Sequence, residues 1–428
     1  MKILISAYAC NPLAPADSHP GEDVIGWNLI KKISHSFELV IITREYNKKN
    51  LIEAIKKENL NNVVFYYIDL PSLPQIIKNN YFGYRVCYWL WQIKAFLLAK
   101  KLHKKYNFDA FHQLTFNNDW MPSYIGAYLG SPFIWGPVGG GQKVPKVFGN
   151  QLCLTDRFKE ITRSIFQEFW RHTPTRIIGM KKAKAVLVCN EETRKKVEKF
   201  NKNIYQFPVN GISQEDLKPG VKIGNLRIRE EGIAKSQTLN PKSFKILFAG
   251  RFDPIKAIPL GLRAFARFNK KYPDSIFEIV GDGPEKIRIE KEIDKLGIRN
   301  SVKIISWLPR EELIKKMRES DVFLFPSLRD GGGAVVVEAM AVGIPVVCLD
   351  LAGPGFHIKD EWGIKIEARN PEYVVEEMAK ALEKLYLDPE LRIQMGINAR
   401  KRAEEYYLWD KLGGRLQKIY EEALHLRD

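Results

Sequence analysis

The sequence has few cysteines, no long hydrophobic run and no internal repeat. Its five cysteines are scattered and odd in number, without the paired spacing of zinc ligands, which argues against a disulfide framework and a zinc site. No apolar run reaches the ~18 residues of a membrane-spanning helix. The apolar stretch at the N-terminus ends at Cys10, so it is too short for a signal peptide and predicts a buried strand. Together these absences favour a protein of the reducing cytoplasm.

Acidic residues are scarce in the first half of the chain. Residues 1–210 contain 30 Lys and Arg against 16 Asp and Glu, whereas residues 211–428 contain 37 against 34, so the first half carries nearly all of the net +17. A solvated, lysine-rich surface explains this excess, and an anionic partner is the alternative. Among partners an anionic membrane surface is favoured over nucleic acid, because no recognisable nucleic-acid motif accompanies the charge.

The length of 428 residues exceeds one comfortable hydrophobic core and predicts two domains. Short apolar strands alternate with helical stretches in both halves, which is typical of parallel βαβ units. Two such series predict an α/β protein with two doubly wound, Rossmann-like domains. The strands are expected at Ile3–Ala7, Glu38–Thr43, Val63–Ile68, Ala110–Leu114, Pro132–Trp135 and Ala185–Cys189, then at Phe244–Ala249, Ser275–Val280, Val302–Ile305, Val322–Pro326 and Pro345–Leu349.

The domain boundary is expected after the segment Phe207–Ile212, which contains a proline and a glycine. We therefore predict a first domain over residues 1–210 and a second over 211–405. Residues 218–243 are polar and weakly periodic, and they are interpreted as a surface excursion. Helices are expected from Met395 to Leu426.

The segment Tyr81–Lys105 is aromatic at its start, aliphatic in its middle and basic at its end. A helix packed in the core with a solvated tail is one interpretation. The other is an interfacial helix, with aromatic rings at headgroup depth and lysines on lipid phosphates.

The densest motif begins at the end of the strand predicted to close at Ala249. Gly250 and Arg251 follow it, and Lys256 precedes a helix expected to begin near Pro259. Ligands of doubly wound sheets bind at the carboxyl ends of strands. A planar guanidinium and a point ammonium charge at that edge suit a diphosphate.

A second motif places two carboxylates, Asp330 and Glu338, around the triplet Gly331, Gly332 and Gly333. The glycines are expected to open a helix whose N–H groups face a phosphate. Glu338 lies in an otherwise apolar run, so its carboxylate must be paired or hydrogen-bonded. The alternative is an ordinary capping aspartate followed by a solvated glutamate.

These motifs resemble the donor half of retaining, family 4 nucleotide-sugar glycosyltransferases with the GT-B fold, of the bacterial surface-polysaccharide type. The resemblance implies two domains facing a central cleft and a last helix, residues 406–428, packing back on the first domain. It also implies that Arg251 and Lys256 stabilise the leaving diphosphate, Asp330 holds sugar hydroxyls and Glu338 the ribose. The chain departs from the family at Ala257, usually glycine, and at Asp330, usually glutamate.

By the same resemblance two further loops border the nucleotide base. They contain Gly281, Asp282 and Gly283 after one strand, and Trp307 and Leu308 after the next. The resemblance implies no metal and no cofactor, with a UDP- or GDP-sugar as the expected donor.

On the acceptor side, the loop after the first strand carries Gly21, Glu22, Gly26 and Trp27. Glu22, Gly26 and Trp27 match part of a glycine-rich loop of one subgroup of the family, whereas Gly21 departs from it. His112 ends a predicted strand and, by resemblance, faces the transferred sugar as a fourth catalytic residue. A satisfied core histidine is the alternative. The loop with Gly139, Gly140 and Gly141 is expected to line the acceptor side.

The predicted function is transfer of a sugar from a nucleoside-diphosphate sugar to a hydroxyl acceptor with retained configuration. The acceptor is expected to be a lipid-linked surface glycan, with the enzyme peripheral on the cytoplasmic face of the plasma membrane. Two alternatives are a nucleotide-sugar 2-epimerase on the same fold and a non-enzymatic module that binds anionic membranes.

Overall fold

The structure is a computed structural model, and it describes residues 1–13, 20–70, 81–130, 132–217, 222–223, 226–229, 232–233 and 243–425. The chain forms two compact units. Unit 1 comprises Met1–Gly141, Arg163–Asn210 and Trp409–Asp428, and unit 2 comprises Gln142–Thr162 and Gly211–Leu408. Residues 142–162, expected in the first domain, therefore group with unit 2. A physical reason is Phe148, which is fully buried within the core of unit 2.

Unit 1 is built on a seven-stranded sheet in which every neighbouring pair is parallel. The order β3-β2-β1-β4-β5-β6-β7 reverses direction between β1 and β4. Its strands are β1 (Lys2–Ser6), β2 (Glu38–Thr43), β3 (Val63–Tyr67), β4 (Ala110–Gln113), β5 (Phe133–Val138), β6 (Ala183–Val188) and β7 (Ile204–Gln206).

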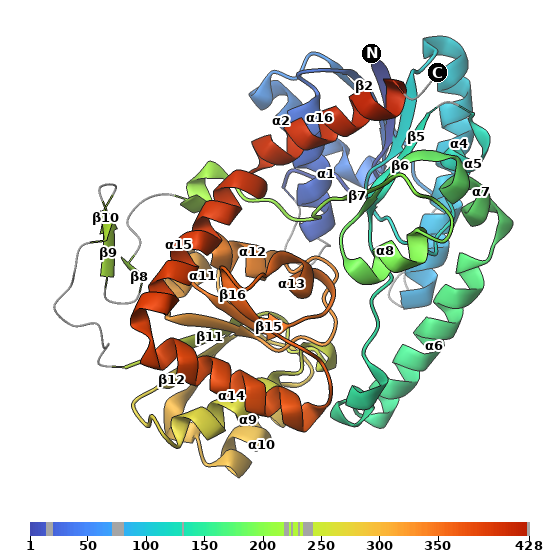
Figure 1. The fold of residues 1–428 in the computed structure, drawn as a ribbon. Coiled ribbons are helices and arrows are strands. Elements are labelled where there is room, and N and C mark those ends of the chain that lie inside the picture. Colours follow the sequence, from blue (N-terminus) through green and yellow to red (C-terminus); the bar gives the residue numbers. More distant parts are fainter. Residues whose placement is uncertain are drawn as a thin grey trace. The chain divides into compact units, whose positions relative to one another are not determined.

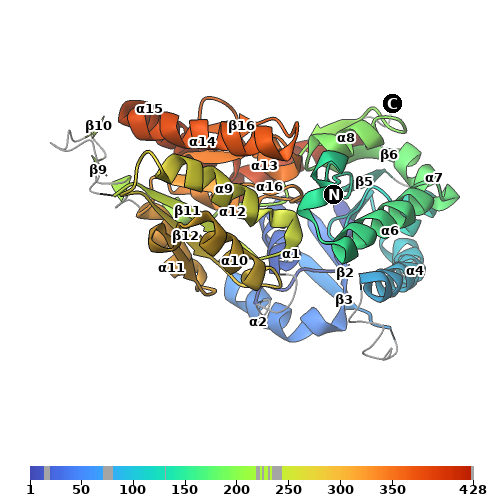
Figure 2. The ribbon, with the colours of Figure 1, turned by 90° about the horizontal axis from the view of Figure 1, so that it is seen from below.

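Helices cover both faces of this sheet, with α1, α2 and α16 on one side and α4, α5 and α7 on the other (Figures 1 and 2). Each face has its own hydrophobic core, as expected for strands that are apolar on both sides. The helices of this region are α1 (Pro20–Ile33), α2 (Lys48–Glu58), α4 (Tyr81–Tyr106), α5 (Tyr124–Tyr128), α6 (Leu154–Arg171, which begins in unit 2), α7 (Pro174–Lys182), α8 (Glu191–Val197) and α16 (Trp409–His425).

Unit 2 contains a six-stranded parallel sheet of order β13-β12-β11-β14-β15-β16, which reverses between β11 and β14. The strands are β11 (Lys245–Ala249), β12 (Ile276–Val280), β13 (Val302–Ile305), β14 (Val322–Phe325), β15 (Val346–Leu349) and β16 (Gly363–Ile366). Both units are doubly wound, so the predicted fold class is confirmed.

Figure 1 shows α9, α10 and α14 on one side of this sheet and α11, α12 and α13 on the other. One continuous core lies between the layers. The helices are α9 (Ile258–Asn269), α10 (Lys286–Leu296), α11 (Arg310–Arg318), α12 (Ala334–Ala341), α13 (Ala352–His357), α14 (Pro371–Leu387) and α15 (Pro389–Tyr406). Short 3₁₀ turns include Lys146–Gln151, Gln214–Leu217 and Pro254–Lys256.

The structure differs from the sequence-based expectations in three places. The edge strands β7 and β16 were not predicted. No residue of β7 is buried, and the two buried residues of β16 are Gly363 and Ile366, so neither strand has a long apolar run. Residues 20–28, expected to be a loop, form the start of α1. The excursion at 218–243 lies mostly outside the described residues, but three short antiparallel strands are seen there: β8 (Lys222–Ile223), β9 (Leu226–Arg229) and β10 (Gly232–Ile233).

The segment Tyr81–Lys105 lies in the helix α4. The burial of its aromatic side chains distinguishes the core-packed interpretation from the interfacial one. Tyr88 and Trp91 are 1% exposed and belong to the core of unit 1, beside Tyr8. The core-packed interpretation is therefore correct for these rings. The lysines at the end of α4 are exposed, as a solvated tail requires.

Candidate active site

The donor motifs meet at the point where the strand order of unit 2 reverses. β11 and β14 are neighbours there, although two other strands separate them in the chain. The loop after β11 carries Arg251 and Lys256, and the loop after β14 carries Asp330. Because helices leave a doubly wound sheet in opposite directions at such a point, the crevice outside the strand ends is its usual ligand site.

Lys256 and Asp330 form an ion pair across this point, between Nζ and Oδ2. Both side chains are largely buried, with 15% and 18% exposed, and the ammonium lies 5.0 Å from the centroid of the Phe325 ring. Burial alone would raise the pKa of Asp330, but Lys256 and the N–H groups of Gly333 and Gly332 outweigh it and hold this pKa below its usual range. The site thus contains a fixed cation and an ionised carboxylate.

Arg251 behaves differently from Lys256. Its side chain is 68% exposed and pairs with Asp253 over 3.1 Å. An exposed pair of this kind contributes little free energy, so the guanidinium can reorient at small cost. Ala257, which follows Lys256, has φ of 49°, a left-handed conformation that glycine adopts more readily than alanine.

The glycine triplet forms a tight turn that leads into α12. Gly332 and Gly333 donate their N–H groups to Oδ1 of Asp330, over 3.2 and 2.7 Å. Gly333 is left-handed, with φ of 61°. Two of the N–H groups expected to face a phosphate are therefore engaged by the Asp330 carboxylate, in the turn that precedes α12.

The turn is backed by two residues that the sequence motifs did not reveal. His357 is buried, with Nε2 2.6 Å from the Gly332 carbonyl oxygen and Nδ1 2.8 Å from the Tyr407 hydroxyl. Burial lowers the pKa of this imidazole to about 4, so the ring is neutral and Nε2 donates to the carbonyl. His357 thereby fixes the position of the glycine turn. No local signal marks this role, because the partners are 25 and 50 positions away.

The loops after β11 and β12 lie against each other. Gly281 has φ of 143°, and a Cβ atom there would come within 2.0 Å of the Gly250 carbonyl oxygen. A Cβ at Gly283 would meet the backbone of Phe252, whose N–H donates to the Asp282 carbonyl over 2.8 Å. The next loop presents Trp307, which is 62% exposed, and Leu308, which packs partly against the core. These glycines are required by close backbone packing.

Glu338 lies in α12, and its carboxylate is paired, as expected for a carboxylate in an apolar run of the sequence. Its Oε1 accepts from Nε of Arg310 over 2.9 Å, and Arg310 also donates to Asp216 over 2.6 Å. Burial raises the pKa of Glu338, and Arg310 offsets only part of that increase. Arg310 and Asp216 were not anticipated, because nothing in their local sequence points to α12.

The acceptor-side residues of unit 1 take mainly structural positions on α1. Gly26 allows α1 to approach the end of β1, since a Cβ atom would lie 2.2 Å from the Ala9 carbonyl oxygen. Trp27 is 7% exposed and belongs to a core cluster, whereas Gly21 is exposed. Glu22 accepts from the Phe116 N–H over 3.2 Å, beside the strand reversal of unit 1, and burial raises its pKa. Of this set Glu22 lies beside the strand reversal, where doubly wound sheets usually bind their ligands.

His112 has no exposed surface. Its Nε2 lies 2.7 Å from the Gly136 carbonyl oxygen, and its Nδ1 lies 2.5 Å from the Tyr420 hydroxyl on α16. Burial lowers the pKa of the ring to about 4. Both ring nitrogens are thus engaged within unit 1. This differs from the sugar-facing position expected for His112 and corresponds to the alternative, a satisfied core histidine.

The loop with Gly139, Gly140 and Gly141 is held by close packing and by a buried ion pair. A Cβ at Gly140 would lie 2.9 Å from Oδ1 of Asp119, and the Gly141 N–H donates to the Thr193 hydroxyl over 3.1 Å. Asp119 in turn pairs with Arg171 over 2.7 Å, at 0% and 5% exposure. The loop is therefore held in place by contacts within unit 1.

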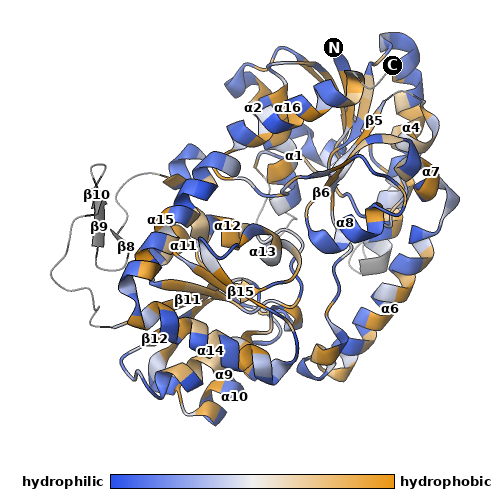
Figure 3. Ribbon diagram, in the orientation of Figure 1, coloured by the Kyte–Doolittle hydropathy of each residue, from blue (hydrophilic) through white to orange (hydrophobic). Residues whose placement is uncertain are grey.

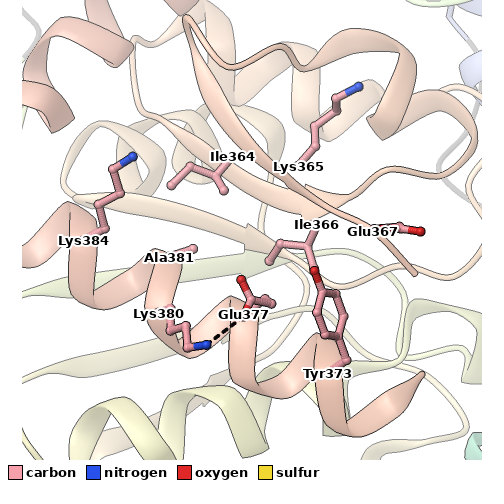
Figure 4. Close-up of a pocket in the computed structure, with 9 residues that line it drawn as sticks. All are labelled: Ile364, Lys365, Ile366, Glu367, Tyr373, Glu377, Lys380, Ala381 and Lys384. Carbon is pink, nitrogen blue, oxygen red and sulfur yellow. Dashed lines mark hydrogen bonds and ion pairs between the residues drawn. The ribbon is translucent and has the colours of Figure 1, made fainter. Parts of the chain in front are cut away.

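A separate hollow of about 330 Å³ lies between β16 and α14, away from the donor motifs (Figure 4). Three lysines, two glutamates and a tyrosine are among the residues that line it, and Lys380 pairs with Glu377 and Glu376. Among the residues that the structure describes, no group of three His, Cys, Asp or Glu side chains is arranged to hold a metal ion. In the same described part of the chain, no helix is long and apolar enough to cross a membrane.

The part of the chain that contains the donor motifs is similar to a known family of proteins. Residues 230–402 match the family model of the glycosyl transferases group 1. The chain is 27% identical over 305 residues to the alpha-D-kanosaminyltransferase of Streptomyces kanamyceticus, covering 69% of this chain and 75% of that one. It is 33% identical over 223 residues to a D-inositol 3-phosphate glycosyltransferase of Corynebacterium kroppenstedtii, covering 50% and 47%.

The fold of the whole chain also has relatives of known structure. Sucrose-phosphate synthase from Thermosynechococcus elongatus, a GT-B protein, superposes with a TM-score of 0.62 over 99% of each chain at 16% identity. A likeness at this identity concerns the fold alone. The chain therefore has the GT-B fold, and its residues 230–402 are similar to the glycosyl transferases group 1, which supports a transferase enzyme.

Proposed function

We propose that this glycosyltransferase takes its sugar from a nucleoside-diphosphate sugar bound to unit 2. The observation that carries the proposal is the Lys256–Asp330 pair at the strand reversal, beside a glycine turn that opens α12. At this position the Lys256 ammonium can pair with a diphosphate, and the Asp330 carboxylate can accept hydrogen bonds from sugar hydroxyls.

The proposed chemistry depends on charge that develops on the leaving group. As the bond from the sugar to the diphosphate breaks, negative charge grows on the diphosphate oxygens. Lys256 stabilises that charge from a site already shielded from water, and Arg251 adds a mobile guanidinium at the rim of the same loop. We assign Glu338, in the second turn of α12, to the ribose hydroxyls, and the resemblance of the donor motifs supports this assignment.

The finer assignment is a family 4 reaction with retained configuration, in which the acceptor hydroxyl attacks from the face that the diphosphate leaves. Resemblance of the donor motifs supports it. The expected acceptor is a lipid-linked surface glycan at the cytoplasmic face of the membrane, supported by the excess of 30 basic over 16 acidic residues in 1–210. Proton NMR of the glycoside product, whose anomeric configuration the glycosidic bond fixes, tests retention directly by comparison with the anomer of the donor.

Calorimetry separates the roles of the two carboxylates. Parent protein is titrated with UDP, GDP and ADP and with their glucose conjugates, to find the nucleotide. Glu338→Gln should weaken the binding of the free nucleoside diphosphate and of the sugar nucleotide equally, roughly tenfold, because both ligands contain the ribose. Asp330→Asn should weaken mainly the binding of the sugar nucleotide, because Asp330 is assigned to the sugar hydroxyls.

A matched control is Asp350→Asn, which removes another carboxylate of unit 2 that pairs with a lysine, Lys365, over 3.0 Å. It should leave both affinities unchanged. Equal losses for the Glu338 and Asp330 variants on both ligands would refute the division of roles. Failure of every nucleotide to bind the parent would refute the donor proposal itself.

A further inference from the structure

Helix α6 is amphipathic but turns its polar side inward. Arg163, Gln167 and Arg171, spaced four residues apart on one face, are 9%, 1% and 4% exposed. A surface helix ordinarily buries its apolar stripe and exposes its charges. Here the buried face contains two guanidinium groups and an amide.

The opposite face of α6 carries five large apolar side chains in solvent. Their exposed fractions range from 50% to 83%, and their spacing of three or four residues places them on one stripe. Figure 3 shows hydrophobic and hydrophilic segments alternating along α6. The stripe consists of Leu154, Phe158, Ile161, Ile165 and Phe169.

Specific contacts fix this orientation of the helix. Arg171 pairs with the fully buried Asp119 over 2.7 Å. Glu160 pairs with Arg329 over 2.9 Å, with both side chains less than one fifth exposed. The Trp170 ring lies 5.9 Å from that of Trp89 on α4. Rolling α6 to hide the stripe would break these pairs and leave buried charges unpaired, so the outward stripe is an established feature of the fold.

We propose that the outward face of α6 docks on an anionic lipid bilayer, with the stripe entering the boundary between headgroups and acyl chains. The inference rests on the proposed function, because a lipid-linked acceptor places the enzyme at such a surface. Exposed cations accompany the stripe: Arg157 and Lys159 flank Phe158, and Lys143 and Lys146 precede the helix. An apolar stripe beside basic residues is the pattern of helices that lie in a membrane interface.

A second copy of the chain fits this face less well. Pairing two copies would bring these cations against their own kind, which opposes association. The stripe also lacks the seven-residue repeat of a helix–helix seam. After Leu154, Phe158, Ile161 and Ile165, that repeat would continue at 168 and 172, which hold Glu168 and His172, whereas the next apolar residue is Phe169.

The proposal moves the membrane contact from α4, where the sequence suggested it, to α6. The aromatic rings Tyr88 and Trp91 of α4 are buried and cannot enter lipid. The exposed lysines at the end of α4 can add electrostatic attraction, but the apolar insertion belongs to α6.

The test compares two double variants of the full chain in sedimentation with vesicles of equimolar phosphatidylglycerol and phosphatidylcholine. Phe158→Ser with Ile165→Ser removes two stripe residues that are 67% and 66% exposed without changing charge. The control, Ile287→Ser with Leu387→Ser, removes apolar residues that are 67% and 62% exposed elsewhere. The stripe variant should bind vesicles roughly 100-fold more weakly than the parent, and the control within about twofold.

Three results would overturn the proposal. They are unchanged vesicle binding by the stripe variant, equal parental binding to pure phosphatidylcholine vesicles, and parental self-association in light scattering that the stripe variant abolishes. Circular dichroism of each variant confirms that it is folded. Calorimetry with UDP and GDP on the same preparations separates this proposal from the donor proposal. A parent that binds vesicles through the stripe but binds no nucleotide leaves α6 as a membrane element and removes only the donor assignment.

Discussion

The two units contain the same buried histidine arrangement in different settings. His112 in unit 1 and His357 in unit 2 each place Nε2 near a glycine carbonyl and Nδ1 near a tyrosine hydroxyl from a C-terminal helix segment. In unit 2 the carbonyl belongs to the turn that carries Asp330. In unit 1 it belongs to Gly136 within β5, and the hydroxyl belongs to α16. A buried histidine with these two partners therefore connects distant segments of the chain, and the segment that carries the glycine carbonyl decides whether the candidate ligand site depends on it.

The largest effect on turnover is expected from Lys256 in unit 2, which pairs with Asp330 in the turn that His357 supports. Lys256→Ala should lower turnover by ~10²–10³, as removal of a fixed group that stabilises leaving-group charge does. The measurement is kcat with the nucleotide sugar that calorimetry selects. Lys365→Ala, which also removes a lysine paired with an aspartate, is the control and should keep normal turnover. Near-normal kcat for Lys256→Ala would exclude the proposed role.

Replacing each histidine sharpens the comparison. His357→Ala and His112→Ala should each lower the free energy of unfolding by about 2–3 kcal/mol, because each leaves a buried carbonyl and a buried hydroxyl without a partner. Only His357→Ala should also weaken UDP or GDP binding, by roughly tenfold, since it frees the turn of Asp330. Urea unfolding and calorimetry measure the two quantities. His172→Ala, whose ring is 66% exposed, serves as the neutral control. If His112→Ala weakens the nucleotide as strongly, the two arrangements are not functionally distinct.

Acid should destabilise both units through these rings. The pKa of each is about 4 in the folded protein, below the ordinary 6.5, so the unfolded chain binds more protons between these values. Stability is complete above pH 6.5 and is lost as pH falls towards 4, by about 2 kcal/mol per histidine at pH 5. Glu22 and Glu338, whose pKa values burial raises, act in the opposite direction. The slope is therefore read as the difference between parent and each His→Ala variant in urea midpoints at pH 7 and 5. Identical slopes would contradict the assignment.

The smallest effect concerns the backbone beside Lys256. Ala257→Gly should raise the free energy of unfolding by up to about 1 kcal/mol, because alanine at φ of 49° is strained. Gly297→Ala is the mirror experiment. That glycine has φ of 69° and open space around its Cβ position, so alanine should cost a similar amount through backbone strain alone. Thermal unfolding of both variants would show opposite signs. The same sign in both would mean that φ does not control stability at these turns.

The sequence predicted the features that depend on local pattern. Apolar runs marked eleven strands, and their spacing indicated two doubly wound sheets. The charged and glycine-rich loops after β11 and β14 were found because strand ends of a parallel sheet share one edge. Partners distant in the chain left no such signal. His357, Tyr407 and Arg310 act through contacts that only the packed fold creates.

The orientation of α6 shows the same limit. Its periodicity marks an amphipathic helix, and amphipathicity ordinarily implies that the apolar face is buried. The inverted placement depends on ion pairs with Asp119 and Arg329, which are 52 and 169 positions away from their partners. Sequence pattern alone cannot supply these distances.

One cysteine gives this region a practical property. Four of the five thiols are buried, and Cys153 is exposed, one residue before α6 begins. A thiol-reactive dye or spin label would therefore attach beside Leu154 in the natural sequence, with no engineered site. The same exposure makes Cys153 the position at which air oxidation can cross-link two molecules during storage. A reducing agent in the buffer, or Cys153→Ser, would keep preparations uniform for every measurement above.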